Sequence, residues 1–147
     1  MDVARARALQ ATLGEVPSIE FGHALPPFFH HIYFWDAQPA DKLGRDGHPQ
    51  TGIFLPKLPL PRRMWAGGEV EVVGPLHPGD QVTKTSTVRD VKFKQGRSGN
   101  LGFVEVDHAY SVGGAVRIRE RQDLVYREDP SPDRPAPEPP QAADWDV

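Results

Sequence analysis

The clearest pattern in the chain is the alternation of apolar and polar residues between residues 66 and 126. Valines and threonines gather there in runs separated by Gly and Pro, which is typical of strands joined by short turns. In the run 104–112, every second residue is Val, His or Tyr, so these side chains fall on one face of a strand. The pattern predicts a curved antiparallel sheet, with a first strand at 69–73 and a long strand at 81–95.

The long strand has an irregularity in its pattern. Val82 and Val88 stand at even-numbered positions, whereas Val91 and Phe93 stand at odd-numbered positions, so the two pairs differ in parity. Because side chains alternate strictly between the two faces of a strand, a change of parity requires an extra residue. The sequence therefore predicts a β-bulge near Arg89 and Asp90.

The last strand follows the pair Gly113-Gly114, which predicts a tight hairpin. Its apolar residues at 116, 118, 124 and 126 share one face, and its arginines at 117, 119 and 121 point to the other. The arginine stripe is expected to be a solvated face rather than a nucleic-acid contact. Nearby acids are expected to neutralise it: Glu105, Asp107, Glu120 and Asp123.

Upstream of the sheet, the pattern predicts helical and irregular elements. Residues 1–13 fit a short surface helix ended by Gly14, since glycine suits the left-handed conformation just past a helix end. The aromatic run 28–35 fits either a short helix or a buried strand by its length. We expect a helix overlapping residues 27–36 to pack on the sheet, followed by a long irregular excursion at 36–61, a type of segment that is often functional.

Composition limits the classes of function. The net charge is −3, with no strong basic excess of the kind that binds nucleic acid or anionic membranes. The chain has no cysteine, which excludes disulfides, thiolate nucleophiles and Cys-type zinc sites. Its start has no long apolar run, so we expect neither a signal peptide nor a transmembrane segment. We expect a cytoplasmic protein with no nucleic-acid or membrane partner.

The chain is predicted to form one domain of the α+β class with a tail. We divide it into an N-terminal helix and lead-in at 1–19, a folded domain at 20–128, and a proline-rich tail or linker at 129–147. The tail contains one aromatic residue, Trp145, so it cannot bury enough apolar surface to offset its ordering entropy. We expect residues beyond about 130 to be mobile in the isolated chain.

Three motifs together resemble a known family: LPRRMWAGG at 60–68, GPLHPGD at 74–80 and GRSG at 96–99. With LPP at 25–27 and DGHP at 46–49, they resemble the N-terminal halves of two-domain MaoC-like hydratases and dehydratases. Mesaconyl-C4-CoA hydratases are the most similar subfamily. The resemblance implies a single hot-dog fold, a curved antiparallel sheet wrapped around a helix, and the addition or removal of water across an acyl-CoA thioester.

In that family, the Asp and His of the hydratase motif lie in the C-terminal half, after a proline-rich linker, and this sequence ends at such a linker. The resemblance therefore implies no catalytic residue here and no cofactor apart from the coenzyme A of the substrate. It implies a homodimer, or a heterodimer with a separately encoded catalytic hot-dog domain, unless the chain is a fragment. The alternative is a lone hot-dog dimer that binds acyl-CoA as a carrier or regulator.

Hydration of an enoyl thioester needs a base, an acid and hydrogen-bond donors to the thioester oxygen. The one local pair of His and carboxylate is Asp46 with His48, but Asp-Gly is commonly a turn, so a homodimer that uses this pair is the weaker hypothesis. We expect His30 and His31 to pack, one facing the sheet and one near its edge. With His23, they have no evident carboxylate partner and no i, i+4 spacing, so no metal site is expected.

The candidate substrate-binding residues are Arg62, Arg63 and Trp65, which lead into the first strand, and Lys94 and Arg97 near a glycine-flanked turn. Guanidinium groups suit the phosphates and the adenine of coenzyme A. The alternatives are a solvated strand entry and a plain hairpin tip. Two adjacent arginines on an extended backbone cannot both point the same way.

Overall fold

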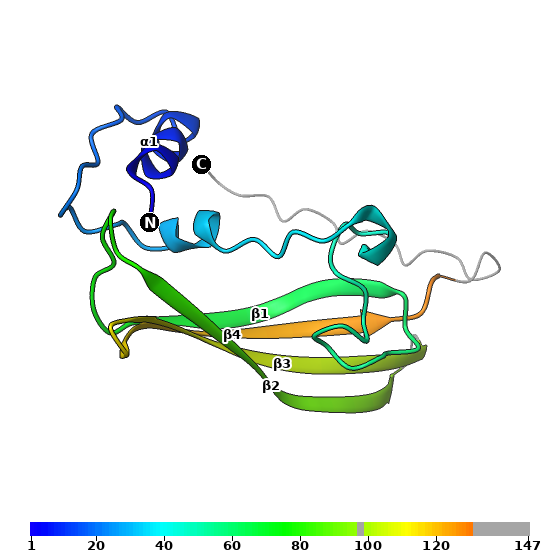
Figure 1. Ribbon diagram of the computed structural model, residues 1–147. Coiled ribbons are helices and arrows are strands. Elements are labelled where there is room, and N and C mark those ends of the chain that lie inside the picture. Colours follow the sequence, from blue (N-terminus) through cyan, green and yellow to red (C-terminus); the bar gives the residue numbers. More distant parts are fainter. Residues whose placement is uncertain (97–98, 131–147) are drawn as a thin grey trace, which may run out of the picture.

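The computed structural model describes residues 1–96 and 99–130, and its centre is one four-stranded antiparallel sheet (Figure 1). The spatial order of the strands is β1-β4-β3-β2, so β1 and β2 form the two edges. All three pairings are antiparallel, which confirms the predicted sheet. The strands are β1 (Arg62–Val72), β2 (Val82–Gly96), β3 (Gly99–Val112) and β4 (Ala115–Arg127).

The bulge and the hairpin lie where the sequence predicts them. In β2, the pairing with β3 shifts between Val88 and Asp90, so that Arg89 is the extra residue. The turn between β3 and β4 consists of Gly113 and Gly114, with φ angles of 56° and 83°. A two-residue turn with positive φ at both positions matches the right-handed twist of the flanking strands, which explains the two glycines.

The first strand is longer than the prediction. It begins at Arg62 rather than at residue 69, and it runs through Gly67 and Gly68 with a shift in register between Trp65 and Gly67. A Cβ added at Gly68 would lie 2.5 Å from the carbonyl oxygen of Arg121. The glycine therefore permits a close approach to β4 instead of ending the strand.

The helices and their connecting segments cover one face of the sheet, here called the inner face (Figure 1). Helix α1 (Val3–Thr12) begins after Asp2, which accepts a hydrogen bond from the Ala4 amide, and it ends before Gly14 with a φ of 79°, as predicted. The predicted helix at 27–36 is confirmed but short, because it is the five-residue 3₁₀ helix η1 (Phe29–Tyr33). Within the described residues, no helix is long and apolar enough to cross a bilayer.

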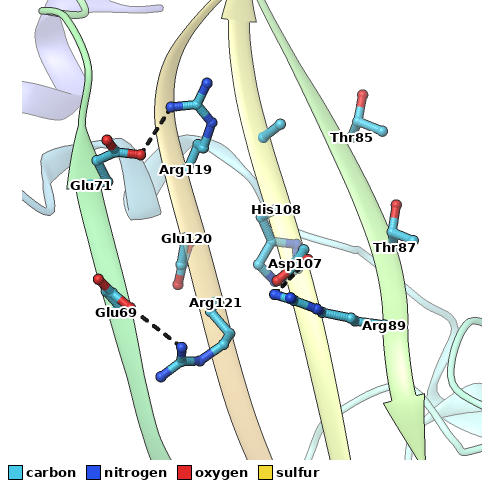
Figure 2. A pocket seen from close by; sticks show the side chains of 11 residues that line it. Glu69, Glu71, Thr85, Thr87, Arg89, Asp107, His108, Arg119, Glu120 and Arg121 are labelled. Carbon is cyan, nitrogen blue, oxygen red and sulfur yellow. Dashed lines mark hydrogen bonds and ion pairs between the residues drawn. The ribbon is translucent and has the colours of Figure 1, made fainter.

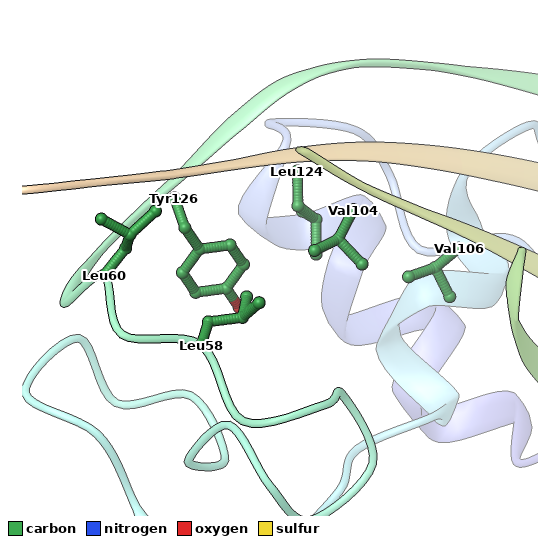
Figure 3. Close-up of a cluster of buried hydrophobic side chains, with 6 residues drawn as sticks. All are labelled: Leu58, Leu60, Val104, Val106, Leu124 and Tyr126. Atoms are coloured by element: carbon green, nitrogen blue, oxygen red, sulfur yellow. The ribbon is translucent and has the colours of Figure 1, made fainter. Parts of the chain in front are cut away.

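The excursion at 36–61 is irregular, as predicted, and among these described residues only the 3₁₀ helix η2 (Ala40–Lys42) and one bridge between Leu43 and Pro49 are regular. Its last part returns to the sheet, where Leu58 and Leu60 are buried. Figure 3 shows them against the inner face, in a core cluster that also contains Val104, Val106, Leu124 and Tyr126.

A second cluster packs α1 against η1, and a third cluster covers the other end of the inner face. Ala6 of α1 packs with Ile19 and Phe29, and Leu76 packs with Tyr110 and Ile118 on the sheet. The two ends of the inner face are therefore closed by apolar packing. The site described below lies between them.

Candidate functional site

A row of polar side chains crosses the middle of the inner face. Ser86, His108 and Glu120 are direct register partners across β2, β3 and β4. They share the parity of the neighbouring core residues, so strand alternation turns them toward the inner face. Both His108 and Glu120 are buried. The inner polar cluster consists of Lys84, Ser86, His108, Tyr110, Glu120 and Gln122.

Glu120 is the most strongly bound member of this cluster. The hydroxyl of Tyr110 donates to its Oε2 at 2.8 Å, and the amide of Gln122 donates to its Oε1 at 2.7 Å. Burial alone would raise the pKa of Glu120, but these donors and the nearby imidazoles of His30 and His31 lower the pKa to about 2. The carboxylate is therefore an anion at neutral pH, held within the sheet.

His30 and His31 approach this carboxylate from η1. His30 is 1% exposed and meets the ring of Tyr110 edge-on, whereas the side chain of His31 is 41% exposed. The Nε2 atom of each imidazole lies 3.9 Å from a Glu120 oxygen, Oε2 for His30 and Oε1 for His31. The prediction that one imidazole faces the sheet is confirmed. The expectation that they have no carboxylate partner is wrong, because their partner comes from a strand distant in sequence.

A cavity of about 540 Å³ lies beside the cluster, between the sheet and the segment 33–55. This volume is within the range of small-molecule pockets. Its wall combines polar groups of the sheet, among them Lys84, Ser86, His108 and Gln122, with apolar side chains. The apolar part includes Phe34, Trp35, Phe54, Val106, Leu124 and Tyr126.

Lys84 is the cationic group of the cluster in this cavity. Its side chain is half-buried, and Nζ lies 5.6 Å from the centre of the Tyr110 ring. Burial lowers the pKa of Lys84, while the charges of Glu120 and Asp36 act in the opposite direction. No ion pair formed between described residues includes Lys84. An anionic ligand in the cavity would supply the charge partner that the ammonium group needs.

The structure does not gather the predicted binding residues into one site. Arg63 lines the cavity and Arg62 does not, consistent with adjacent side chains pointing apart. Trp65 is 69% exposed and does not line it either. Lys94 lines a separate depression of about 340 Å³, and its Nζ lies 5.2 Å from the centre of the Phe103 ring. Arg97 lies outside the described residues.

The interpretation of Asp46 and His48 as a turn is confirmed. The carboxylate of Asp46 accepts a hydrogen bond of 3.1 Å from the backbone amide of His48, and Gly47 between them has a φ of 77°. The imidazole of His48 lines the cavity, whereas Asp46 lines a different depression. The pair is therefore held together through the backbone of its own turn.

The opposite, outer face of the sheet carries the arginine stripe, where acids of β1 neutralise two of the arginines. Arg119 binds Glu71 at 2.9 Å and Arg121 binds Glu69 at 3.3 Å, beside a depression of about 500 Å³. Figure 2 shows both pairs. These contacts are exposed, which agrees with the prediction of a solvated face. The inclusion of Glu120 among its neutralising acids is wrong, since its carboxylate bonds to the inner polar cluster.

The sequence contained a signal for the cluster. Glu120 and Gln122 have the parity of Ile118 and Leu124, which the alternation assigns to the core face. In the same way, Lys84 shares the parity of the neighbouring valines in β2. Polar residues at core parity in three neighbouring strands indicate a buried polar site. Their register, which brings them together, is known only from the structure.

Comparisons with known proteins agree with the architecture. Residues 28–147 match the family model of hydroxyacyl-thioester dehydratase type 2. The chain is 42% identical over 139 residues to the mesaconyl-C(4)-CoA hydratase of Chloroflexus aurantiacus, and the match covers 93% of this chain and 49% of that protein. The chain thus spans about half the length of this relative. These matches confirm the resemblance drawn from the motifs.

Two solved structures from Mycobacterium tuberculosis share the fold at low sequence identity. A chain of the ChsH1-ChsH2 complex superposes with a TM-score of 0.64 at 14% identity, covering 94% of this chain and 84% of that one. HtdX superposes with a TM-score of 0.50 at 18% identity, covering 96% of this chain and 51% of that one. The sheet with its helical cover is therefore a hot-dog domain.

Proposed function

Because the chain belongs to the hydroxyacyl-thioester dehydratase type 2 family, we propose that it is the substrate-binding half of an acyl-CoA hydratase or dehydratase. In this proposal, a second hot-dog domain supplies the Asp and His that add or remove water across the enoyl thioester. The observation that carries it is the cavity of about 540 Å³ on the inner face. The match covers about half of a hydratase that is twice as long, which supports an enzyme in which one domain binds the substrate and another carries the catalytic residues.

The chemistry of the cavity favours an acyl group with its own charge. Its aromatic and aliphatic wall suits a short hydrocarbon chain, and Lys84 offers a half-buried ammonium group. A mesaconyl thioester, the substrate named for the relative, carries a free carboxylate besides the thioester. Such a carboxylate would form a charge-assisted hydrogen bond with Lys84. The substrate proposed for this chain is therefore an enoyl-CoA of the mesaconyl type.

Coenzyme A itself requires contacts beyond the acyl group. Arg63 lines the cavity and is the first candidate for them. The other predicted contacts, Arg62, Trp65, Lys94 and Arg97, remain candidates for the parts of coenzyme A that lie outside this cavity.

The histidines of the cavity support a catalytic partner. His48 and His108 both line it, but in the described part of the chain neither forms an ion pair with a carboxylate. The Nδ1 of His108 lies 2.8 Å from Ser86 Oγ, and burial lowers the pKa of its imidazole. General acid–base catalysis contributes about a hundredfold to ten-thousandfold, so a cavity whose own histidines have no carboxylate partner is expected to be nearly inactive without a second domain.

The test is reconstitution of activity. The purified chain is assayed for hydration of mesaconyl-C4-CoA and crotonyl-CoA, alone and with the C-terminal hot-dog half of the Chloroflexus relative. We expect negligible turnover alone and clear turnover in the mixture. Ordinary turnover by the chain alone, abolished in His48→Ala, would show a self-sufficient site in the loop. Acyl-CoA binding by the chain alone, with no activity from any partner, would support the carrier function instead.

A further inference from the structure

The inner face holds a group of potential metal ligands that the proposed function does not use. His30 and His31 from η1 and Glu120 from β4 each place one ligand atom so that the three lie within 4.8 Å of one another. From this geometry we propose that the three residues bind a divalent transition-metal ion, with zinc as the best match.

The first argument is an unsatisfied nitrogen atom. The side chain of His30 is 2% exposed, and its Nε2 has no hydrogen-bond partner among the described residues. Leaving such a polar atom buried and unpaired costs about 1–3 kcal/mol. The nitrogen points to Glu120 Oε2 at 3.9 Å, which is too long for a hydrogen bond. A metal ion between the two atoms would give the nitrogen a partner.

The ligand types and their spacing fit zinc. Two imidazoles and one carboxylate form the three-ligand set that leaves the fourth tetrahedral position of zinc to water or substrate. Two ligand atoms at about 2.1 Å from a tetrahedral ion lie about 3.4 Å apart. Each imidazole nitrogen lies 3.9 Å from a carboxylate oxygen, His30 from Oε2 and His31 from Oε1, and one ligand atom of each residue lies within 4.8 Å of the other two. The two pairs at 3.9 Å must therefore close by about 0.5 Å, and the widest pair of the set by up to about 1.4 Å, through side-chain rotation. The partly exposed His31 gives the ion a route of entry.

The surroundings of Glu120 also suit a metal ligand. The donors Tyr110 and Gln122 occupy one lone pair on each carboxylate oxygen and fix the orientation of the group. A carboxylate has about four acceptor positions, so lone pairs remain for a metal ion. Carboxylates that bind metals are held by outer hydrogen bonds of this kind.

The experiment measures metal binding by the chain itself. The tag-free chain is stripped with a chelator and titrated with Zn²⁺ by calorimetry and with Co²⁺ by visible absorption. We expect one ion per chain and the intense absorption of tetrahedral cobalt. His31→Gln is the main variant, because its partly exposed side chain can be replaced without opening the core. It should weaken Zn²⁺ binding by more than about tenfold, the loss seen even for groups that only orient a ligand.

His23→Gln is the matched control, since His23 is exposed and lies apart from the cluster. It should bind Zn²⁺ as the unaltered chain does, while Glu120→Gln should lose binding together with His31→Gln. The proposal is overturned if the stripped chain binds neither ion, if His31→Gln binds Zn²⁺ with unchanged affinity, or if His23→Gln loses as much affinity. None of these measurements depends on hydratase activity, so they test the metal site separately from the proposed function.

Discussion

The Tyr110 hydroxyl donates a hydrogen bond of 2.8 Å to Glu120 Oε2, which links β3 to β4 inside the buried inner face. The pair lies on a diagonal of the sheet, because the direct register partner of Glu120 is His108 and that of Tyr110 is Ile118. Burial, reinforced by this bond and by the carboxylate charge, raises the pKa of Tyr110. The centre of the sheet therefore holds a fixed negative charge surrounded by donors, where an ordinary core would be apolar.

Replacing Tyr110 with Phe tests the strength of this bond. The change keeps the ring that packs on His30 and Phe34 but removes the donor to a buried charge. We expect the free energy of unfolding to fall by about 1–3 kcal/mol in urea titrations at pH 7. In a Glu120→Gln background, Tyr110→Phe should lower the free energy of unfolding by clearly less, because the hydroxyl no longer has a charged acceptor to lose. Equal losses in both backgrounds would contradict the role given to the bond.

The low pKa of Glu120 predicts how stability depends on pH. In the folded chain the pKa is about 2, below the ordinary value of 4.5, so the folded state favours the ionised form. Such a group stabilises the fold above its unfolded pKa, and this contribution is lost as the pH falls toward 2. The difference in unfolding free energy between the unaltered chain and Glu120→Gln should therefore shrink between about pH 5 and pH 2. Glu69→Gln, on the exposed outer face, is the control and should show a much smaller dependence.

The sheet was predictable because strand geometry has a strict period of two. The change of parity before Val91 predicted the bulge at Arg89, and two adjacent glycines predicted the β3–β4 turn. The start of β1 was not predictable in this way. Gly67 and Gly68 resemble a break in the sequence, and only their contact with β4 shows why glycine is needed within the strand.

The site was less predictable, because it depends on contacts between distant segments. Alternation alone assigns Glu120 to the core face, but it does not show that η1 brings His30 and His31 to that carboxylate. Of the described basic residues that were chosen from local motifs, only Arg63 lines the cavity. Lys84 shares the parity of Val82 and Val88, which assigns it to the core face, but only the structure shows that it lines the cavity.

The contact between the excursion 36–61 and the sheet predicts a large effect of core truncation. Leu124 is 3% exposed and belongs to the cluster that holds Leu58 and Leu60 on β3 and β4. Leu124→Ala should lower the unfolding free energy by about 2–5 kcal/mol, through lost burial and the cavity left behind. Phe93 is exposed, so Phe93→Ala is the comparison and should lower the unfolding free energy by less than about 1 kcal/mol. Comparable losses for the two variants in urea titrations would contradict this packing.

Lys84 provides the sharpest test of the ligand. If its ammonium group binds the free carboxylate of a mesaconyl-type acyl group, then Lys84→Met should lower the affinity for that ligand. The affinity for a ligand without a free carboxylate should stay the same. The loss of a hydrogen bond between charged groups corresponds to about 1.5–3 kcal/mol, or roughly tenfold to a hundredfold in affinity. Because burial lowers the pKa of Lys84, removing its charge relieves a desolvation cost. The variant should therefore be at least as stable as the unaltered chain, which separates lost affinity from unfolding.

The measurement is calorimetric titration of the chain alone, which is expected to turn over neither thioester, with mesaconyl-C4-CoA and with crotonyl-CoA, which lacks the second carboxylate. Lys94→Met is the matched control, because Lys94 lines a separate depression near Leu60 and Phe93. It should not change the ratio of the two affinities, whereas Lys84→Met should reduce the preference for mesaconyl-C4-CoA about tenfold or more. An equal loss for both ligands in Lys84→Met would assign Lys84 to coenzyme A rather than to the acyl group. An unchanged affinity for both would remove Lys84 from the binding site, because the charge partner it needs would then not be the substrate.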